Sequence, residues 1–186
     1  MSGTSSFFML ADGARPVPQC HTDEMKRALV ALALLAASVA QTAPITTVIL
    51  IRHAERVSTT DKDSPISDAG LAHATALAQM LRDANIRAVY VTQYKRTQQT
   101  AKPFGIEPTV VGTATTYAAD LVDRIRKEHA GETVLVVSHS NTIPDVIKQL
   151  GVANPPAIGD NDYDNVFIVT TAGSSAKLTT LHVATR

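Results

Sequence analysis

The stretch Thr46-Thr47-Val48-Ile49-Leu50-Ile51-Arg52-His53 decides the fold of this chain. Residues 46–51 form a continuous β-branched and apolar run, which predicts a strand buried on both faces and hence a strand of a parallel sheet. A second run of this kind, residues 133–137, leads through Ser138 into His139. Ligands bind beyond the carboxyl ends of the strands in open α/β sheets. Both histidines are therefore expected at the functional edge of one sheet.

The rest of the chain supplies further strands with helices between them. Short strands are expected at 88–91 and 110–111, and a closing strand pair at 166–171 and 178–183. Helical spacing and capping residues predict helices at 67–81, with Ser67 as N-cap, and at 95–102, 117–129 and 142–150. This alternation predicts an α/β fold, a three-layer sandwich with a mostly parallel central sheet flanked by helices.

The composition restricts the possible partners. Seventeen basic residues balance seventeen acidic residues over the 186 positions, so no overall charge attracts nucleic acid or an anionic membrane. The chain has no Trp and only 4% aromatic residues, which disfavours stacking platforms for bases. We therefore expect no nucleic-acid partner.

The N-terminal part is typical of an export signal. Lys26 and Arg27 precede an apolar stretch of about ten residues, and Ser38-Val39-Ala40 offers small residues for cleavage. The stretch is shorter than the roughly twenty residues that span a bilayer. We expect residues 25–40 to be a signal peptide and residues 41–186 to be the functional domain. A periplasmic or secreted location without stable membrane association would follow.

Residues 1–24 fit neither the signal nor the domain. We expect them to be an upstream or non-native extension, with Met25 as the natural start. The single cysteine of the chain, Cys20, lies in this extension. A processed chain would then form no disulfide and no zinc–thiolate site, and we expect no cofactor.

Four residues near the expected strand ends suit phosphate chemistry. Arg52 and His53 follow the first strand, Arg96 lies near the start of the helix after strand 88–91, and His139 follows strand 133–137. The planar guanidinium groups match phosphate oxygens. One neutral imidazole can attack phosphorus, and a second can stabilise the group in transfer. The sequence therefore predicts a phosphoryl-transfer pocket without a metal.

These residues resemble the histidine phosphatase superfamily, the phosphoglycerate-mutase-like proteins, in its small single-domain phosphatase branch. The Arg-His-Gly signature of the family resembles Arg52-His53-Ala54, and its Leu-Ser/Thr-x-x-Gly helix start resembles residues 66–70. Its Ser-x-x-x-Arg-x-x-Gln-Thr-Ala pattern resembles residues 92–101, and its second histidine follows a Val-rich strand as His139 does. The resemblance runs from Thr46 to Thr171.

The resemblance implies a phosphatase that hydrolyses phosphomonoesters or phosphoramidates. His53 would accept the phosphoryl group as phosphohistidine, and Arg52, Arg96 and His139 would complete the phosphate pocket. The substrate would be a phosphorylated small molecule or a phosphohistidine protein. Asn141, which opens a helix after His139, is expected to add a phosphate hydrogen bond.

The proton donor departs from the family pattern. Many members carry a Glu between the second arginine and the second histidine, but residues 109–119 contain no acid. Another branch has an Asp directly after the second histidine, where this chain has Ser140. Glu55 is the carboxyl group nearest to the nucleophile in sequence and is our candidate donor, with Asp164 as a second candidate.

Other functions compete with this interpretation. His53-x-Glu55 resembles part of a zinc hydrolase or deaminase motif, which needs a Cys or His pair downstream, and no cysteine follows it. Ser138-His139-Ser140 lacks the flanking glycines of a serine hydrolase. A mutase is disfavoured, because residues 41–186 leave little chain for a lid that excludes water. The main alternative is a non-catalytic phosphate-binding protein of the same fold, since the usual donor is missing.

Overall fold

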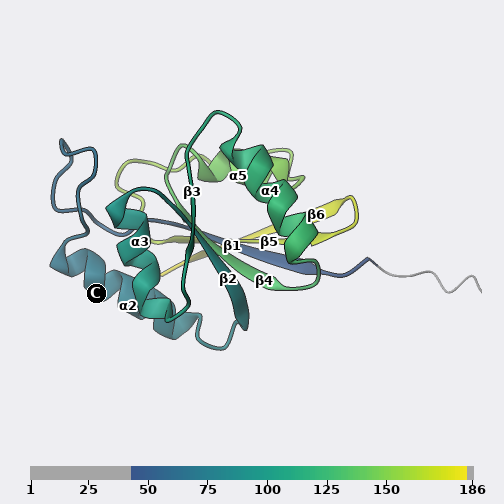
Figure 1. Ribbon diagram of the computed structural model, residues 1–186, viewed down its shortest axis with the longest axis horizontal. Helices are drawn as coiled ribbons and strands as arrows, with labels where there is room; N and C mark the ends of the chain where they lie inside the picture. Colours follow the sequence, from purple (N-terminus) through teal and green to yellow (C-terminus); the bar gives the residue numbers. More distant parts are fainter. Residues whose placement is uncertain (1–42, 184–186) are drawn as a thin grey trace, which may run out of the picture. The chain divides into compact units, whose positions relative to one another are not determined.

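The computed structural model describes residues 43–183, so the expected extension, the expected signal peptide and residues 184–186 lie outside the described part. Six strands and four α-helices form the domain, with one 3₁₀ turn, η1 (Figure 1). In chain order the elements are β1 (Thr46–Arg52), α2 (Asp68–Met80), β2 (Ile86–Thr92), α3 (Lys95–Ala101), η1 (Lys102–Phe104), β3 (Thr109–Val111), α4 (Tyr117–Glu128), β4 (Thr133–Ser138), α5 (Ile143–Gln149), β5 (Asn165–Ala172) and β6 (Ser175–His182).

The strands form one sheet in the order β3-β2-β4-β1-β5-β6. The pairs β1–β4, β2–β4 and β2–β3 are parallel, whereas β5 pairs antiparallel with both β1 and β6. Residues 46–51, which were expected to be a doubly buried parallel strand, lie near the centre of this sheet. The prediction of an α/β fold with a mostly parallel sheet is confirmed.

The helices cover both faces of the sheet and complete the three layers. Figure 1 shows α2 and α3 on one side of the sheet and α4 and α5 on the other. Alternate residues of β1 therefore enter two different cores. Val48 and Leu50 pack with residues of α4 and α5, whereas Ile49 and Ile51 pack with residues of α2 and α3. Full burial of each such side chain stabilises the fold by about 1.5–3 kcal/mol, which explains the unbroken apolar run.

The start of α2 is fixed by two residues of the expected helix signal. Ser67 is the N-cap, and its hydroxyl accepts a hydrogen bond from the Gly70 backbone N–H at 3.1 Å. A Cβ at Gly70 would collide with the backbone carbonyl of Glu55. Glycine is therefore required because α2 packs directly on the segment that carries His53.

The element ends differ from the expected ends by a few residues, and the largest change of structure is at Pro103. We expected the helix to stop before this proline. Instead, α3 ends at Ala101 and the chain continues into η1, Lys102–Phe104, before Gly105 takes a left-handed conformation with φ 69°. Proline fits because it lies in the first turn of the new 3₁₀ segment, where its missing N–H costs no hydrogen bond.

The topology brings the carboxyl ends of β1, β2 and β4 together. β1 and β4 are adjacent and in register from Thr47 opposite Thr133 to Arg52 opposite Ser138. The chain leaves β1 toward α2 on one face and leaves β4 toward α5 on the other face. Connections that diverge in this way open a crevice at the sheet edge, and the four predicted residues lie at this crevice.

Candidate active site

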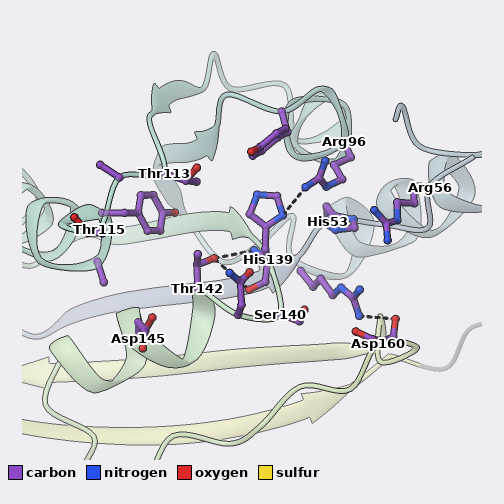
Figure 2. A pocket seen from close by; sticks show the side chains of 16 residues that line it. His53, Arg56, Arg96, Thr113, Thr115, His139, Ser140, Thr142, Asp145 and Asp160 are labelled. Atoms are coloured by element: carbon purple, nitrogen blue, oxygen red, sulfur yellow. Dashed lines mark hydrogen bonds between the residues drawn. The ribbon is translucent and has the colours of Figure 1, made fainter. Parts of the chain in front are cut away.

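A cavity of about 600 Å³ lies at this edge of the sheet. Arg52, His53, Arg96 and His139 all line it, so the structure brings together the four residues that the sequence singled out. Figure 2 shows His139 with its ring turned toward Arg96, and His53 beside them. Asn141 also lines the cavity, as expected.

His53 is held as a neutral imidazole with one nitrogen free. The residue is 4% exposed, and its Nδ1 lies 2.8 Å from the carbonyl oxygen of Ala54. A carbonyl only accepts hydrogen bonds, so Nδ1 carries the proton and Nε2 keeps its lone pair. Burial lowers the pKa of His53 to about 3, and the bond to Ala54 opposes this shift while His139, Arg96 and Arg52 add to it.

The backbone around His53 is fixed from two sides. The His53 N–H donates to the Ser138 carbonyl at 2.9 Å, which ties the end of β1 to the end of β4. The Ala54 N–H donates to the hydroxyl of Thr100 on α3 at 2.9 Å. In-line phosphoryl transfer requires the attacking atom to be held in a fixed position. The contacts of His53 to a strand and a helix provide such a fixed position.

His139 faces His53 across the cavity, with ring centroids 5.4 Å apart. Its Nε2 lies 3.0 Å from the Thr92 hydroxyl, and its Nδ1 lies 3.3 Å from Nη2 of Arg96. Because a guanidinium only donates, Nδ1 accepts and Nε2 carries the proton. Burial first, then the charges of Arg96, Arg52 and Arg56, lowers the pKa of His139 to about 4.

The guanidinium groups of Arg52 and Arg96 are aimed by backbone carbonyls and aromatic rings. Nη1 of Arg52 donates to the carbonyls of Gly159 and Asp160 at 2.8 and 2.9 Å, and the group lies 4.2 Å from the ring centre of Tyr163. Nη1 of Arg96 donates to the Lys62 carbonyl at 2.8 Å. The Nε atoms of both arginines are buried and have no partner in the described residues. Both arginines line the cavity, and the arginine fork suits an anion such as phosphate.

A third arginine, Arg56, lines the same cavity, and the sequence did not single it out. It follows His53 by three residues, in the segment that forms an isolated bridge between Arg56 and Ile66. The one signal that could have found it is its closeness to the Arg52-His53 pair. The charge of Arg56 lowers the pKa of Arg96, although burial of Arg96 is the larger cause.

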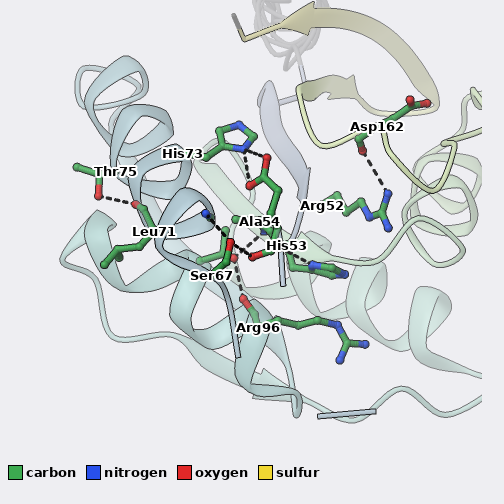
Figure 3. Close-up of polar contacts among 12 residues, drawn as sticks. Arg52, His53, Ala54, Ser67, Leu71, His73, Thr75, Arg96 and Asp162 are labelled. Carbon is green, nitrogen blue, oxygen red and sulfur yellow. Dashed lines mark hydrogen bonds and ion pairs between the residues drawn. The ribbon is translucent and has the colours of Figure 1, made fainter. Parts of the chain in front are cut away.

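Neither predicted proton donor lines the cavity. Both carboxylate oxygens of Glu55 lie 3.2 Å from Nδ1 of His73 on α2, and Figure 3 shows His73 on the opposite side from the guanidinium of Arg96. The carboxylate of Asp164 pairs instead with His182 at 3.1 Å. The structure thus places both acids in pairs with other histidines.

Two other carboxylates line the cavity, those of Asp145 and Asp160. Figure 2 shows them on opposite margins of the site, and both residues are exposed. Asp145 lies in the first turn of α5, where an acid is a common helix-start residue. Neither Asp145 nor Asp160 belongs to a sequence pattern that connects it with the site.

Residues 43–183 were searched for metal-binding clusters and for membrane-spanning helices. This part of the chain contains no group of three or more His, Cys, Asp or Glu side chains placed to hold a metal ion. It also contains no helix with the length and apolar character to cross a membrane.

Comparison with known proteins agrees with the site. Residues 48–115 match the family model of the histidine phosphatase superfamily (branch 1), a segment that contains Arg52, His53 and Arg96. No curated protein sequence matches the chain.

Several solved structures share the fold. A proposed phosphohistidine phosphatase SixA from Nakamurella multipartitia is 24% identical, with a TM-score of 0.57 over 76% of this chain and 98% of that chain. The protein histidine phosphatase SixA in complex with tungstate is 18% identical, with a TM-score of 0.59 over 73% and 96%. A phosphoserine phosphatase from Entamoeba histolytica is 16% identical, with a TM-score of 0.57 over 75% and 98%. Residues 48–115 thus match the histidine phosphatase superfamily, and the fold is the one seen in these phosphatase structures.

Proposed function

We propose that this protein is a metal-independent phosphatase that works through a phosphohistidine at Nε2 of His53. The observation that carries the proposal is the state of His53 in the cavity. Its Nδ1 is committed to the Ala54 carbonyl, and burial lowers its pKa to about 3. The imidazole is therefore neutral at physiological pH, and Nε2 has a lone pair beside two arginines. The match of residues 48–115 to the histidine phosphatase superfamily supports phosphatase activity in general.

The proposed reaction has two displacements at phosphorus. Nε2 of His53 attacks, the bond from phosphorus to the leaving oxygen or nitrogen breaks, and the leaving group departs with that electron pair and takes up a proton. Water then attacks the phosphohistidine, the P–N bond breaks, and inorganic phosphate leaves. Both steps move charge onto the three non-bridging oxygens. The guanidinium groups of Arg52 and Arg96, which line the cavity, would bind those oxygens.

His139 and Asn141 complete the proposed phosphate site. When phosphate draws Arg96 away from Nδ1 of His139, that nitrogen becomes free to meet a protonated phosphate oxygen or to carry a proton. The side chain of Asn141 lines the cavity from the loop before α5 and adds an amide donor. In this scheme the chain supplies all of the positive charge that the transferring group needs.

The leaving group decides which substrates fit best. A general acid that assists departure is typically worth about 10²–10⁴-fold. A carboxyl group usually has to be buried to keep its proton at neutral pH, whereas Asp145 and Asp160 are exposed and Glu55 lies against His73. We propose that substrates whose leaving group needs little help are preferred, namely aryl phosphates and phosphoramidates, including phosphohistidine in a protein.

Steady-state kinetics on three substrates tests this proposal. The kcat/KM for a phosphoramidate and for an aryl phosphate should exceed that for an alkyl phosphate by at least about 10²-fold, and EDTA should leave all three rates unchanged. Equal rates on the three substrates would show that an acid assists the leaving group. Asp145→Asn and Asp160→Asn would then identify the acid, because the variant that lacks it would hydrolyse the alkyl phosphate more slowly and the other two substrates at the wild-type rate.

The alternative proposal is a phosphate-binding protein without turnover. The observation that favours it is that Glu55 and Asp164, the two expected donors, are bound to histidines outside the cavity. Tungstate or phosphate binding without hydrolysis of any phosphoramidate, aryl or alkyl phosphate would select this alternative.

Export remains a separate proposal, supported by Lys26, Arg27 and the small residues at 38–40. A periplasmic or secreted protein should begin at Gln41. N-terminal sequencing of the protein from a periplasmic fraction measures this directly, and a cytosolic protein that keeps Met25 would contradict it.

A further inference from the structure

Arg56 is the guanidinium of the cavity that the rest of the protein uses least. Arg52 and Arg96 each donate to backbone carbonyls, at 2.8–2.9 Å. No side-chain hydrogen bond of Arg56 to any described residue is present, and its Nε is buried without a partner. No carboxylate of the described residues lies within salt-bridge distance of it. A partly buried charge without a counter-charge is costly. The cavity therefore contains one guanidinium, that of Arg56, whose charge no described residue balances.

The phosphoryl group does not need this third guanidinium. A phosphomonoester dianion carries about two negative charges, which Arg52 and Arg96 already balance. Its three non-bridging oxygens can be met by Arg52, Arg96 and His139, one group for each oxygen. Arg56 lines the cavity beside this set, and its charge contributes to lowering the pKa of both Arg96 and His139.

We propose that Arg56 binds a second anionic group of the substrate, so that the preferred substrates carry a carboxylate or a second phosphate close to the phosphoryl group. This inference rests on the proposed function, because it assumes that the phosphoryl group occupies the Arg52–Arg96 site. A cavity of about 600 Å³ has room for both groups. The planar fork of arginine suits either anion.

Binding of two inert phosphonates tests the proposal without turnover. Ethylphosphonate and phosphonoacetate share the same two-carbon skeleton, but only the second carries a carboxylate. Isothermal titration of the full chain should give a Kd about tenfold lower for phosphonoacetate, the size expected for a charge-assisted hydrogen bond near solvent. Arg56→Gln should remove this preference and change the Kd of ethylphosphonate by less than about twofold. Arg56→Lys should keep part of it, because the charge stays and the fork is lost.

The matched control is Arg87→Gln, which removes an exposed positive charge from the opposite end of β2. It should keep the preference of the wild type. Equal binding of the two phosphonates by the wild type, or no binding of either, would overturn the proposal. So would an equal loss for both in Arg56→Gln, because Arg56 would then hold the phosphoryl group itself. An intact preference in a protein that hydrolyses no phosphate ester would leave this inference standing and reject only the proposed phosphatase activity.

Discussion

The histidines inside the cavity differ from those outside it in one respect. His73, His129 and His182 each have a carboxylate partner within 2.8–3.2 Å, namely Glu55, Glu132 and Asp164. His53 and His139 have none and are surrounded by arginines, and burial lowers the pKa of both. Burial beside guanidinium groups excludes the imidazolium form. His53 and His139 are thus held in the cavity as neutral imidazoles.

The largest expected effect separates the two groups of histidines by activity. His53→Ala should lower kcat/KM on an aryl phosphate by about 10⁴-fold or more, as loss of a nucleophile does elsewhere. His182→Ala, at an exposed pair on β6, should keep the wild-type rate. The measurement is steady-state hydrolysis by both purified variants. Substantial activity in His53→Ala would contradict the proposal that His53 is the nucleophile.

The arginines around the cavity histidines give the next effect. Arg52→Ala and Arg96→Ala should each lower kcat by about 10²–10³-fold, the loss seen when one preorganised donor of a transition state is removed. Arg87→Gln serves as the control, because it removes a charge far from the cavity. Rate losses below tenfold in both cavity variants would mean that the guanidinium groups do not stabilise the transferring group.

The two cavity histidines should also make the stability of the protein sensitive to acid. His53 and His139 stay neutral in the folded protein down to about pH 3 and 4, whereas in the unfolded chain they bind protons below about 6.5. The unfolded state therefore gains protons first as pH falls, and stability decreases from pH 6.5 toward pH 4. Each of these histidines should lower the free energy of unfolding by roughly 1–2 kcal/mol between pH 7.5 and pH 5.

Urea unfolding at both pH values measures this loss. The difference in unfolding free energy between pH 7.5 and pH 5 should be smaller in His139→Gln than in the wild type. Arg87→Gln, which removes no histidine, should leave the difference unchanged. An identical pH dependence in all three proteins would show that His139 is protonated in the folded state.

The smallest expected effect concerns the Glu55–His73 pair. Its side chains lie outside the cavity, so Glu55→Gln should change kcat/KM by less than about threefold for alkyl and aryl phosphates alike, and should cost about 1 kcal/mol of stability. A selective loss of alkyl phosphate hydrolysis in this variant would restore Glu55 as the proton donor.

The sequence predicts those parts of the site that depend on local pattern. The runs at 46–51 and 133–137 identify β1 and β4, and parallel pairing then puts His53 and His139 at one edge. Gly70 and Ser67 mark the start of α2 for reasons that the structure explains, a close backbone approach and a cap.

The parts that the sequence could not predict depend on contacts between distant segments. Glu55 is two residues from the nucleophile, but His73 on α2 holds its carboxylate outside the cavity. Arg52 is aimed by the carbonyls of residues 159 and 160, more than a hundred positions along the chain. Side-chain direction in loops follows no period. The positions of Arg56 and Asp160, which line the cavity from two different loops, could therefore not be inferred.

The most direct test of the account is to trap the covalent state. The full chain is mixed with a phosphoramidate or an aryl phosphate, quenched in alkali within the first turnovers, and digested for mass spectrometry under conditions that preserve phosphohistidine. We predict a phosphoryl group on His53 in the wild type, at a higher level in His139→Gln if the second displacement is slowed, and none in His53→Ala. Hydrolysis of substrate with no labelled His53, or a label on another residue, would contradict the proposed mechanism.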